Sequence, residues 1–178
     1  MNNLAKLTID HHRSAERNRF AKYLISGNIT PHEYATYLYN VYLQYNALEL
    51  LAENHELLDT KLANKIYSDF MKIKDKNHLY SVFDASRKYI WYLKTIENDP
   101  EKIMAHVYVR HMGDLSGGQI IAKKVPGEAS MYNFDDRVEQ IKSQIRSRCS
   151  DSMADEANRC FEFVTSFFTE CADEFNLA

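Results

Sequence analysis

The sequence predicts an all-α fold of about seven or eight helices, arranged as a single domain over residues 1–178. Three observations lead to this prediction. The 178 residues include only 5 glycines and 3 prolines, too few for a β fold rich in turns. Apolar residues recur at helical spacing, and no segment alternates as a half-buried strand would. The length is that of one domain.

Clear stop and start signals delimit the first two helical segments. Residues 4–26 are expected to be helical, with a break near residues 14–18, and Gly27 ends this segment. Thr30-Pro31-His32-Glu33 then combines a capping box with proline at the first helical position. This motif predicts a helix over residues 31–54, whose apolar side chains follow amphipathic spacing.

The remaining helices begin after residues that favour helix N-termini. Asn98-Asp99-Pro100-Glu101 repeats the combination of cap and proline, and Pro126-Gly127 stops the helix that it opens. The expected segments run from residue 59 or 60 to 73, around 79–83, from 84 or 86 to 96, from 98 to about 124, from 133 or 135 to 149, and from the turn at 151–154 to about 175.

Charge and composition exclude several classes of protein. A net charge of −3 argues against a general nucleic-acid binder. No apolar run reaches the roughly 18 residues that a membrane span needs, and the N-terminus lacks a secretion signal, so we expect a cytoplasmic protein without a membrane partner. Cys149, Cys160 and Cys171 would lie about 16 Å apart if they shared one helix, too far to bind one metal ion, and core-facing thiols are expected.

A cluster of glycines marks the first candidate site. Gly113, Gly117 and Gly118 fall inside a segment that its flanks mark as helix, where each glycine costs about 1 kcal/mol relative to alanine. Either helix packing or a flat ligand lying on bare main chain could compensate. Asp114 shares this broad face, and a carboxylate there favours a ligand site, because an unpaired buried charge is costly. The glycine spacing does not match a phosphate-binding loop.

A histidine near the N-terminus marks the second candidate site. His12 and Glu16 are four residues apart and face each other on a helix. The carboxylate would fix the imidazole tautomer and leave the other nitrogen for a metal. Zinc needs three or four protein ligands, whereas haem iron needs only one axial histidine. Lys142 and Arg146 could hold the haem propionates, although solvated surface charge is the plainer interpretation of those two residues.

The motifs together resemble those of the haem oxygenases. The segment 113–119 (Gly-Asp-Leu-Ser-Gly-Gly-Gln) closely resembles the distal-helix motif of that family, and His12-x-x-Ala15-Glu16 resembles its proximal-histidine segment. Tyr42-x-x-Tyr45-x-Ala47-Leu48-Glu49 and Arg146-Ser147-Arg148 resemble two further segments, so the similarity covers most of the chain. His111 departs from the pattern, since a tyrosine is common there.

The resemblance implies a fold with haem between a proximal and a kinked distal helix. It also implies cleavage of haem b at a meso carbon to biliverdin, carbon monoxide and Fe²⁺, using O2 and an external electron donor. We expect this donor to be ferredoxin and the protein to be a monomer. The resemblance implies that His12 is the axial iron ligand, with Glu16 as its hydrogen-bond partner. Gly113 and Gly117 would lie over the haem with Gly118 beside them, and Asp114 would organise a distal water relay with Tyr45. The residues implied near the propionates are Lys142, Arg146, Tyr108 and the out-of-register Lys6.

Three other functions stay open on sequence grounds. A haem-binding protein for storage, transport or sensing would keep His12 but would not need Asp114 or Tyr45. A helical interaction protein would use its glycines only for packing and would bind no haem. A haem-free enzyme on a similar scaffold should lack the pairing of His12 with Glu16.

Overall fold

Helices account for all the regular secondary structure that the computed structural model describes, which covers residues 2–178. The ten α-helices of this part of the chain outnumber the seven or eight expected. They are α1 (Leu4–Leu7), α2 (Ile9–Glu16), α3 (Arg19–Leu24), α4 (Pro31–Asn54), α5 (Ala63–Ile73), α6 (Asp84–Thr95), α7 (Pro100–Ser116), α8 (Gly118–Ile121), α9 (Val138–Ser147) and α10 (Ala154–Glu174), with 3-10 turns η1 (Ser130–Tyr132) and η2 (Asp151–Met153).

The capping signal at residue 30 is confirmed in detail. The Thr30 hydroxyl accepts a hydrogen bond from the N–H of Glu33 at 3.2 Å, and the Glu33 carboxylate accepts one from the N–H of Thr30 at 3.0 Å. Gly27, which ends the preceding segment, has a φ of +82°, a conformation that favours glycine. Local signals therefore mark the end of the preceding segment and the start of α4.

Two predicted helical segments are divided further than expected, which explains the larger number of helices. The break expected near residues 14–18 is present between α2 and α3, and a further break at Thr8 separates α1 from α2. Residues 4–26 form α1, α2 and α3, and Asn18 caps α3 by accepting a hydrogen bond from the N–H of Phe20 at 2.9 Å. Residues 98–124 divide at Gly117 into α7 and α8. The distal helix therefore ends inside the glycine motif.

The short helix expected around residues 79–83 is wrong, because this segment is not helical. The side chain of Asn40, buried in α4, occupies its backbone groups instead. The Asn40 amide donates to the carbonyl of Ser81 at 3.1 Å, and its oxygen accepts from the N–H of Phe83 at 2.8 Å. Backbone N–H and C=O groups that would form hydrogen bonds within a helix are thus bonded to a side chain distant in sequence.

Two carboxylates remote in sequence cap helices that lack a side-chain cap of their own. Glu49 of α4 accepts two backbone hydrogen bonds at the start of α5, at 2.6 and 3.1 Å. Glu170 of α10 does the same at the start of α6, at 3.0 and 2.8 Å. Negative groups are favourable at helix N-termini. Because Glu49 sets its start, α5 begins at Ala63, later than the expected residue 59 or 60.

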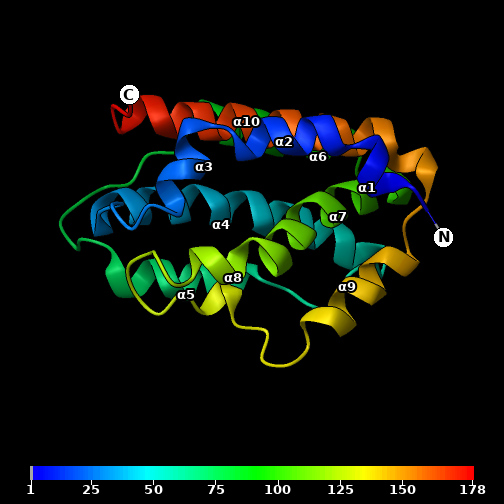
Figure 1. The fold of residues 1–178 in the computed structure, drawn as a ribbon, viewed down its shortest axis with the longest axis horizontal. Helices are drawn as coiled ribbons and strands as arrows, with labels where there is room; N and C mark the ends of the chain where they lie inside the picture. Colours follow the sequence, from blue (N-terminus) through cyan, green and yellow to red (C-terminus); the bar gives the residue numbers. More distant parts are fainter. Residues whose placement is uncertain (1) are drawn as a thin grey trace.

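The long helix α10 supports both α2, which carries His12, and α7, which carries Asp114 (Figure 1). The long helix α10 packs against α2 and α3 and also against α6 and α7, while α4 packs against α5, α6 and α7. Cys160 and Cys171 are buried on α10, whereas the half-buried Cys149 precedes it; all three are free thiols. None of the helices between residues 2 and 178 combines the length and apolar character required to cross a bilayer.

Candidate functional site

One face of the distal helix exposes bare main chain. A Cβ atom added at Gly113 would meet no heavy atom within 4 Å, and one at Gly117 would meet only the Gly113 carbonyl oxygen, at 3.6 Å. Both glycines are exposed. The open space at these two positions can admit a flat ligand close to the helix backbone.

The third glycine has a different environment from the other two, although the sequence groups all three. A Cβ at Gly118 would lie 2.3 Å from the Tyr132 ring, so only glycine fits at that contact. Gln119 reinforces the same packing by donating a hydrogen bond to the carbonyl of Tyr132 at 2.8 Å. Gly118 is therefore buried against η1 and does not share the open face, which differs from the expectation that it lies beside the haem.

Asp114 is held from beneath by a tyrosine of α4. The Tyr45 hydroxyl donates a hydrogen bond to the Asp114 carboxylate at 2.5 Å and also lies 3.3 Å from the carbonyl of Arg110. Burial raises the pKa of Asp114 to about 6, even though the Tyr45 hydrogen bond and the nearby His111 and Arg110 favour its charged form. A carboxyl group that titrates near neutrality is suited to exchange protons with water.

Arg110 lies under this pair, and sequence analysis gave it no role. Its guanidinium donates to the Gln44 side chain at 2.8 Å and lies 4.9 Å from the centre of the Tyr45 ring. The position of Arg110, four residues before Asp114 on one helix, is the signal that could have identified it. The buried cation supports the ring that in turn orients Asp114.

The predicted pair on the proximal helix is present in the structure. His12 Nε2 lies 3.0 Å from Glu16 Oε1, and the two side chains are 47% and 65% exposed. The His12 ring also packs against Phe161 of α10, with ring centroids 5.6 Å apart. The neighbouring His11 instead contacts Glu162 of α10 at 3.4 Å. His12 thus presents a half-exposed imidazole with one nitrogen next to a carboxylate.

Tyr108 of α7 lies near Thr8, the residue that precedes α2. The Tyr108 hydroxyl interacts with the Thr8 side chain, and burial raises the pKa of Tyr108. His12 follows Thr8 by one helical turn, and Gly113 follows Tyr108 by five residues on α7. Tyr108 therefore links α7 to the start of the segment that carries His12.

The basic residues expected near the haem propionates lie close to one another, at the end of the molecule where the N-terminus lies. Lys142 and Arg146 occupy α9, which packs against α7, and Lys142 also contacts Glu139 at 3.6 Å. Lys6 is exposed in the last turn of α1. Asn2 donates a hydrogen bond to the carbonyl of Arg146 at 3.4 Å, which brings the segment before α1 against α9. Figure 1 shows α1 and α9 toward the same side of the view, where the N-terminus lies.

Comparison with known proteins identifies the family and the fold. The family model described as Heme oxygenase matches residues 1–170. Heme oxygenase 2 of Mus musculus is 28% identical over 92% of this chain, which spans only 62% of that protein's length. The structure is similar to that of heme oxygenase-1 from the cyanobacterium Synechocystis in complex with heme (TM-score 0.84, 24% identity, 96% of this chain and 91% of that one). It is also similar to the heme oxygenase of Leptospira interrogans (TM-score 0.80, 26% identity, 94% and 97% of the two chains). The chain therefore belongs to the heme oxygenase family.

Proposed function

We propose that this protein cleaves haem b at a meso carbon to biliverdin, carbon monoxide and Fe²⁺, using O2 and an external electron donor. The observation that carries the proposal is the Tyr45–Asp114 pair beside the open backbone at Gly113. A protein that only stores or carries haem needs an axial histidine but no carboxyl group poised to exchange protons on the other side. The proposal therefore depends on Asp114 more than on His12.

The residues present fit a haem group. Its flat ring needs a face without side chains, which Gly113 and Gly117 supply, and its iron needs one imidazole, which His12 of α2 would supply. The carboxylates on its edge would be held by basic and hydroxyl groups from three helices, namely Lys142, Arg146, Tyr108 and Lys6. Bound haem supplies the iron that activates oxygen and is itself the substrate that is opened.

Each side chain of the site would have a separate role. Glu16 would orient the His12 imidazole from its second nitrogen. The bare backbone at Gly113 and Gly117 would allow close approach and so fix the substrate's position. Asp114 would hold ordered water and pass protons through it, since its pKa of about 6 lets it both gain and lose a proton near neutrality. Burial and the neighbouring Asp114 raise the pKa of Tyr45 well above its usual value, so its hydroxyl remains a donor.

The reaction can be tested with purified protein and haemin. Under air, ascorbate or reduced ferredoxin should cause the Soret band to disappear while the red absorption of biliverdin grows. A Soret band that persists through reduction would instead indicate a haem-binding protein without turnover. The same assay identifies the electron donor, for which we propose ferredoxin, because the exposed Arg146 of α9 and the exposed Arg148 just after it would attract an acidic partner. Turnover supported only by a membrane-bound flavoprotein would contradict that choice.

Replacing the carboxyl group tests the role given to Asp114. Asp114→Asn keeps the shape of the side chain and its contact with Tyr45 but cannot exchange a proton, so ring opening should slow by about 100-fold or more while haem still binds. Asp136→Ala, which changes an exposed aspartate, is the matched control and should react like the wild type. Normal ring opening by Asp114→Asn would exclude the proposed proton relay.

A further inference from the structure

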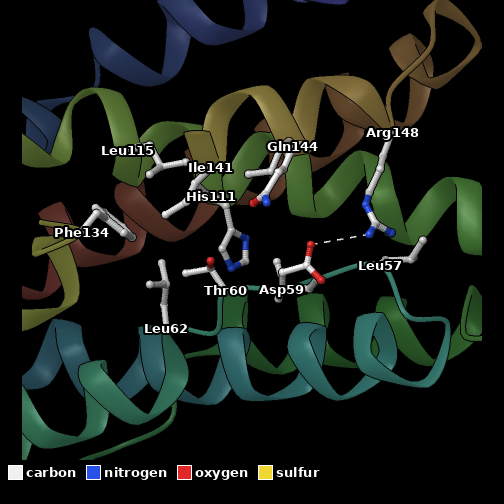
Figure 2. Close-up of a pocket in the computed structure, with 12 residues that line it drawn as sticks. Leu57, Asp59, Thr60, Leu62, His111, Leu115, Phe134, Ile141, Gln144 and Arg148 are labelled. Carbon is white, nitrogen blue, oxygen red and sulfur yellow. Dashed lines mark ion pairs between the residues drawn. The ribbon is translucent and has the colours of Figure 1, made fainter. Parts of the chain in front are cut away.

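A small cavity lies behind the distal helix, on the side away from the open glycines. Its volume is about 20 Å³, and it is bounded by α7, by α9 and by the segment between α4 and α5. Figure 2 shows His111 extending from α7 into this space, with the Thr60 side chain beside the lower edge of its ring and Gln144 above it. Gly113 follows His111 by two residues, about 200° around the helix, which places the cavity behind the open face.

His111 is held on one side only. Its Nε2 lies 3.2 Å from Glu49 Oε1, and both side chains are almost fully buried. The Glu49 carboxylate already accepts backbone hydrogen bonds from the start of α5, so it acts as an acceptor, and Nε2 of His111 carries the hydrogen. His111 Nδ1 is buried and has no hydrogen-bond partner in the protein.

Thr60, at the same cavity, also has a buried polar atom without a hydrogen-bond partner. Its hydroxyl oxygen is buried without a partner and, like His111, it lines the cavity. Leaving a buried polar atom without a hydrogen-bond partner destabilises the fold, so two such atoms at one cavity point to a shared partner. One water molecule needs about 10–15 Å³ and two or more polar neighbours, and the cavity meets both conditions.

We propose that one water molecule binds in this cavity between His111 Nδ1 and Thr60 Oγ1, and that it makes His111 a positioning residue for Asp114. Water suits the site because it can donate to a bare ring nitrogen and accept from a protonated one. The rigid orientation that results is needed because the His111 ring packs against Tyr45, with centroids 5.5 Å apart, and Tyr45 donates to Asp114.

Charged and titratable groups surround His111 on α4, on its own helix and at the edge of the cavity. Glu49 and Tyr45 face it from α4, Arg110 and Asp114 share its helix, and the ion pair between Asp59 and Arg148, 3.6 Å long, lies at the edge of the cavity (Figure 2). His111 lowers the pKa of Asp114, and Glu49 raises it. A change in the orientation of the imidazole should therefore alter the titration of Asp114.

The water is tested first by crystallography of the haem-free protein. In the wild type, and in Thr60→Ser, which keeps the hydroxyl, density for one water is expected within about 2.7–3.2 Å of both atoms. Thr60→Val has nearly the same shape without the hydroxyl, and the water should be lost or displaced. A dry cavity in the wild type, or an unmoved water in Thr60→Val, overturns the proposal.

The positioning role needs a measurement that a purely structural role would not affect. In haem-free protein with carbon-13 in the aspartate carboxyl groups, the NMR titration midpoint of Asp114 should shift by about half a pH unit in Thr60→Val. Thr60→Ser should titrate like the wild type. A loss of stability in Thr60→Val with an unchanged Asp114 midpoint overturns the positioning role. Because no haem is present, this result is independent of whether the protein turns haem over.

Discussion

Two imidazole–carboxylate pairs in this protein have nearly the same length and different surroundings. His12 and Glu16 lie 3.0 Å apart on α2, with side chains 47% and 65% exposed. His106 of α7 and Glu156 of α10 lie 2.9 Å apart, with side chains 0% and 9% exposed. The separation alone would assign both pairs the same function, so burial must distinguish them.

The buried pair is part of a network, whereas the exposed pair is free to change partners. His106 Nδ1 lies 3.0 Å from the Tyr89 hydroxyl, and Tyr92 donates to Glu156. Burial by itself would lower the pKa of His106, but Cys160 and Glu156 outweigh it and raise the pKa to about 9. Water screens the pair on α2. The buried pair therefore joins two helices, and the exposed imidazole stays available to a ligand.

Breaking the buried pair should give the largest effect on stability. His106→Phe leaves the Glu156 carboxylate without its buried partner, which should lower the free energy of unfolding by about 3–5 kcal/mol. Chemical denaturation of haem-free protein measures this change. The double variant His106→Phe/Glu156→Gln removes the unpaired charge and should recover part of the loss. A single variant as stable as the wild type would mean that burial does not set the importance of this pair.

The pH dependence of stability should show the same network with a smaller effect. His106 has a folded pKa of about 9, above its ordinary value of 6.5, so folding favours its protonated form. Its contribution is complete below pH 6.5 and is lost as the pH rises through 9, a decrease of about 1–3 kcal/mol in the free energy of unfolding. Denaturation at a series of pH values tests this. A flat profile between pH 6.5 and 9, or the same slope in the double variant, would contradict it.

Breaking the exposed pair should give the smallest effect. Glu16→Gln removes a screened charge one helical turn from His12, so the free energy of unfolding of haem-free protein should change by less than about 0.5 kcal/mol. The comparison with His106→Phe under the same conditions is the control. A loss above about 1 kcal/mol would show that the α2 pair has a structural role despite its exposure.

The sequence predicted those features whose partners lie within one or two helical turns. The capping box at Thr30 and the pair of His12 with Glu16 are separated by three and four residues, so helix geometry alone identifies them. The contact between Tyr45 and Asp114 spans 69 residues and came only from the resemblance to a family. Helical periodicity carries no information at that separation.

The features that the sequence did not predict all depend on distant partners. Asn40 keeps residues 81–83 from forming a helix, and Glu170 caps α6 from 85 or more residues away. Gly118 cannot be distinguished from Gly117 by spacing, because only the Tyr132 ring separates their environments. Propensity patterns describe a segment in isolation, whereas these outcomes depend on which side chains the fold brings to it.

The carboxylate of Glu49 links the start of α5 to the imidazole of α7. Its two oxygens accept from the N–H groups of Leu62 and Ala63 and from His111 Nε2. Local opening at the first turn of α5 would release the same acceptor that holds the imidazole of α7. Amide hydrogen exchange at Leu62 and Ala63 should therefore report on the mobility of α7, because opening of the first turn of α5 would also release the His111 side chain of α7.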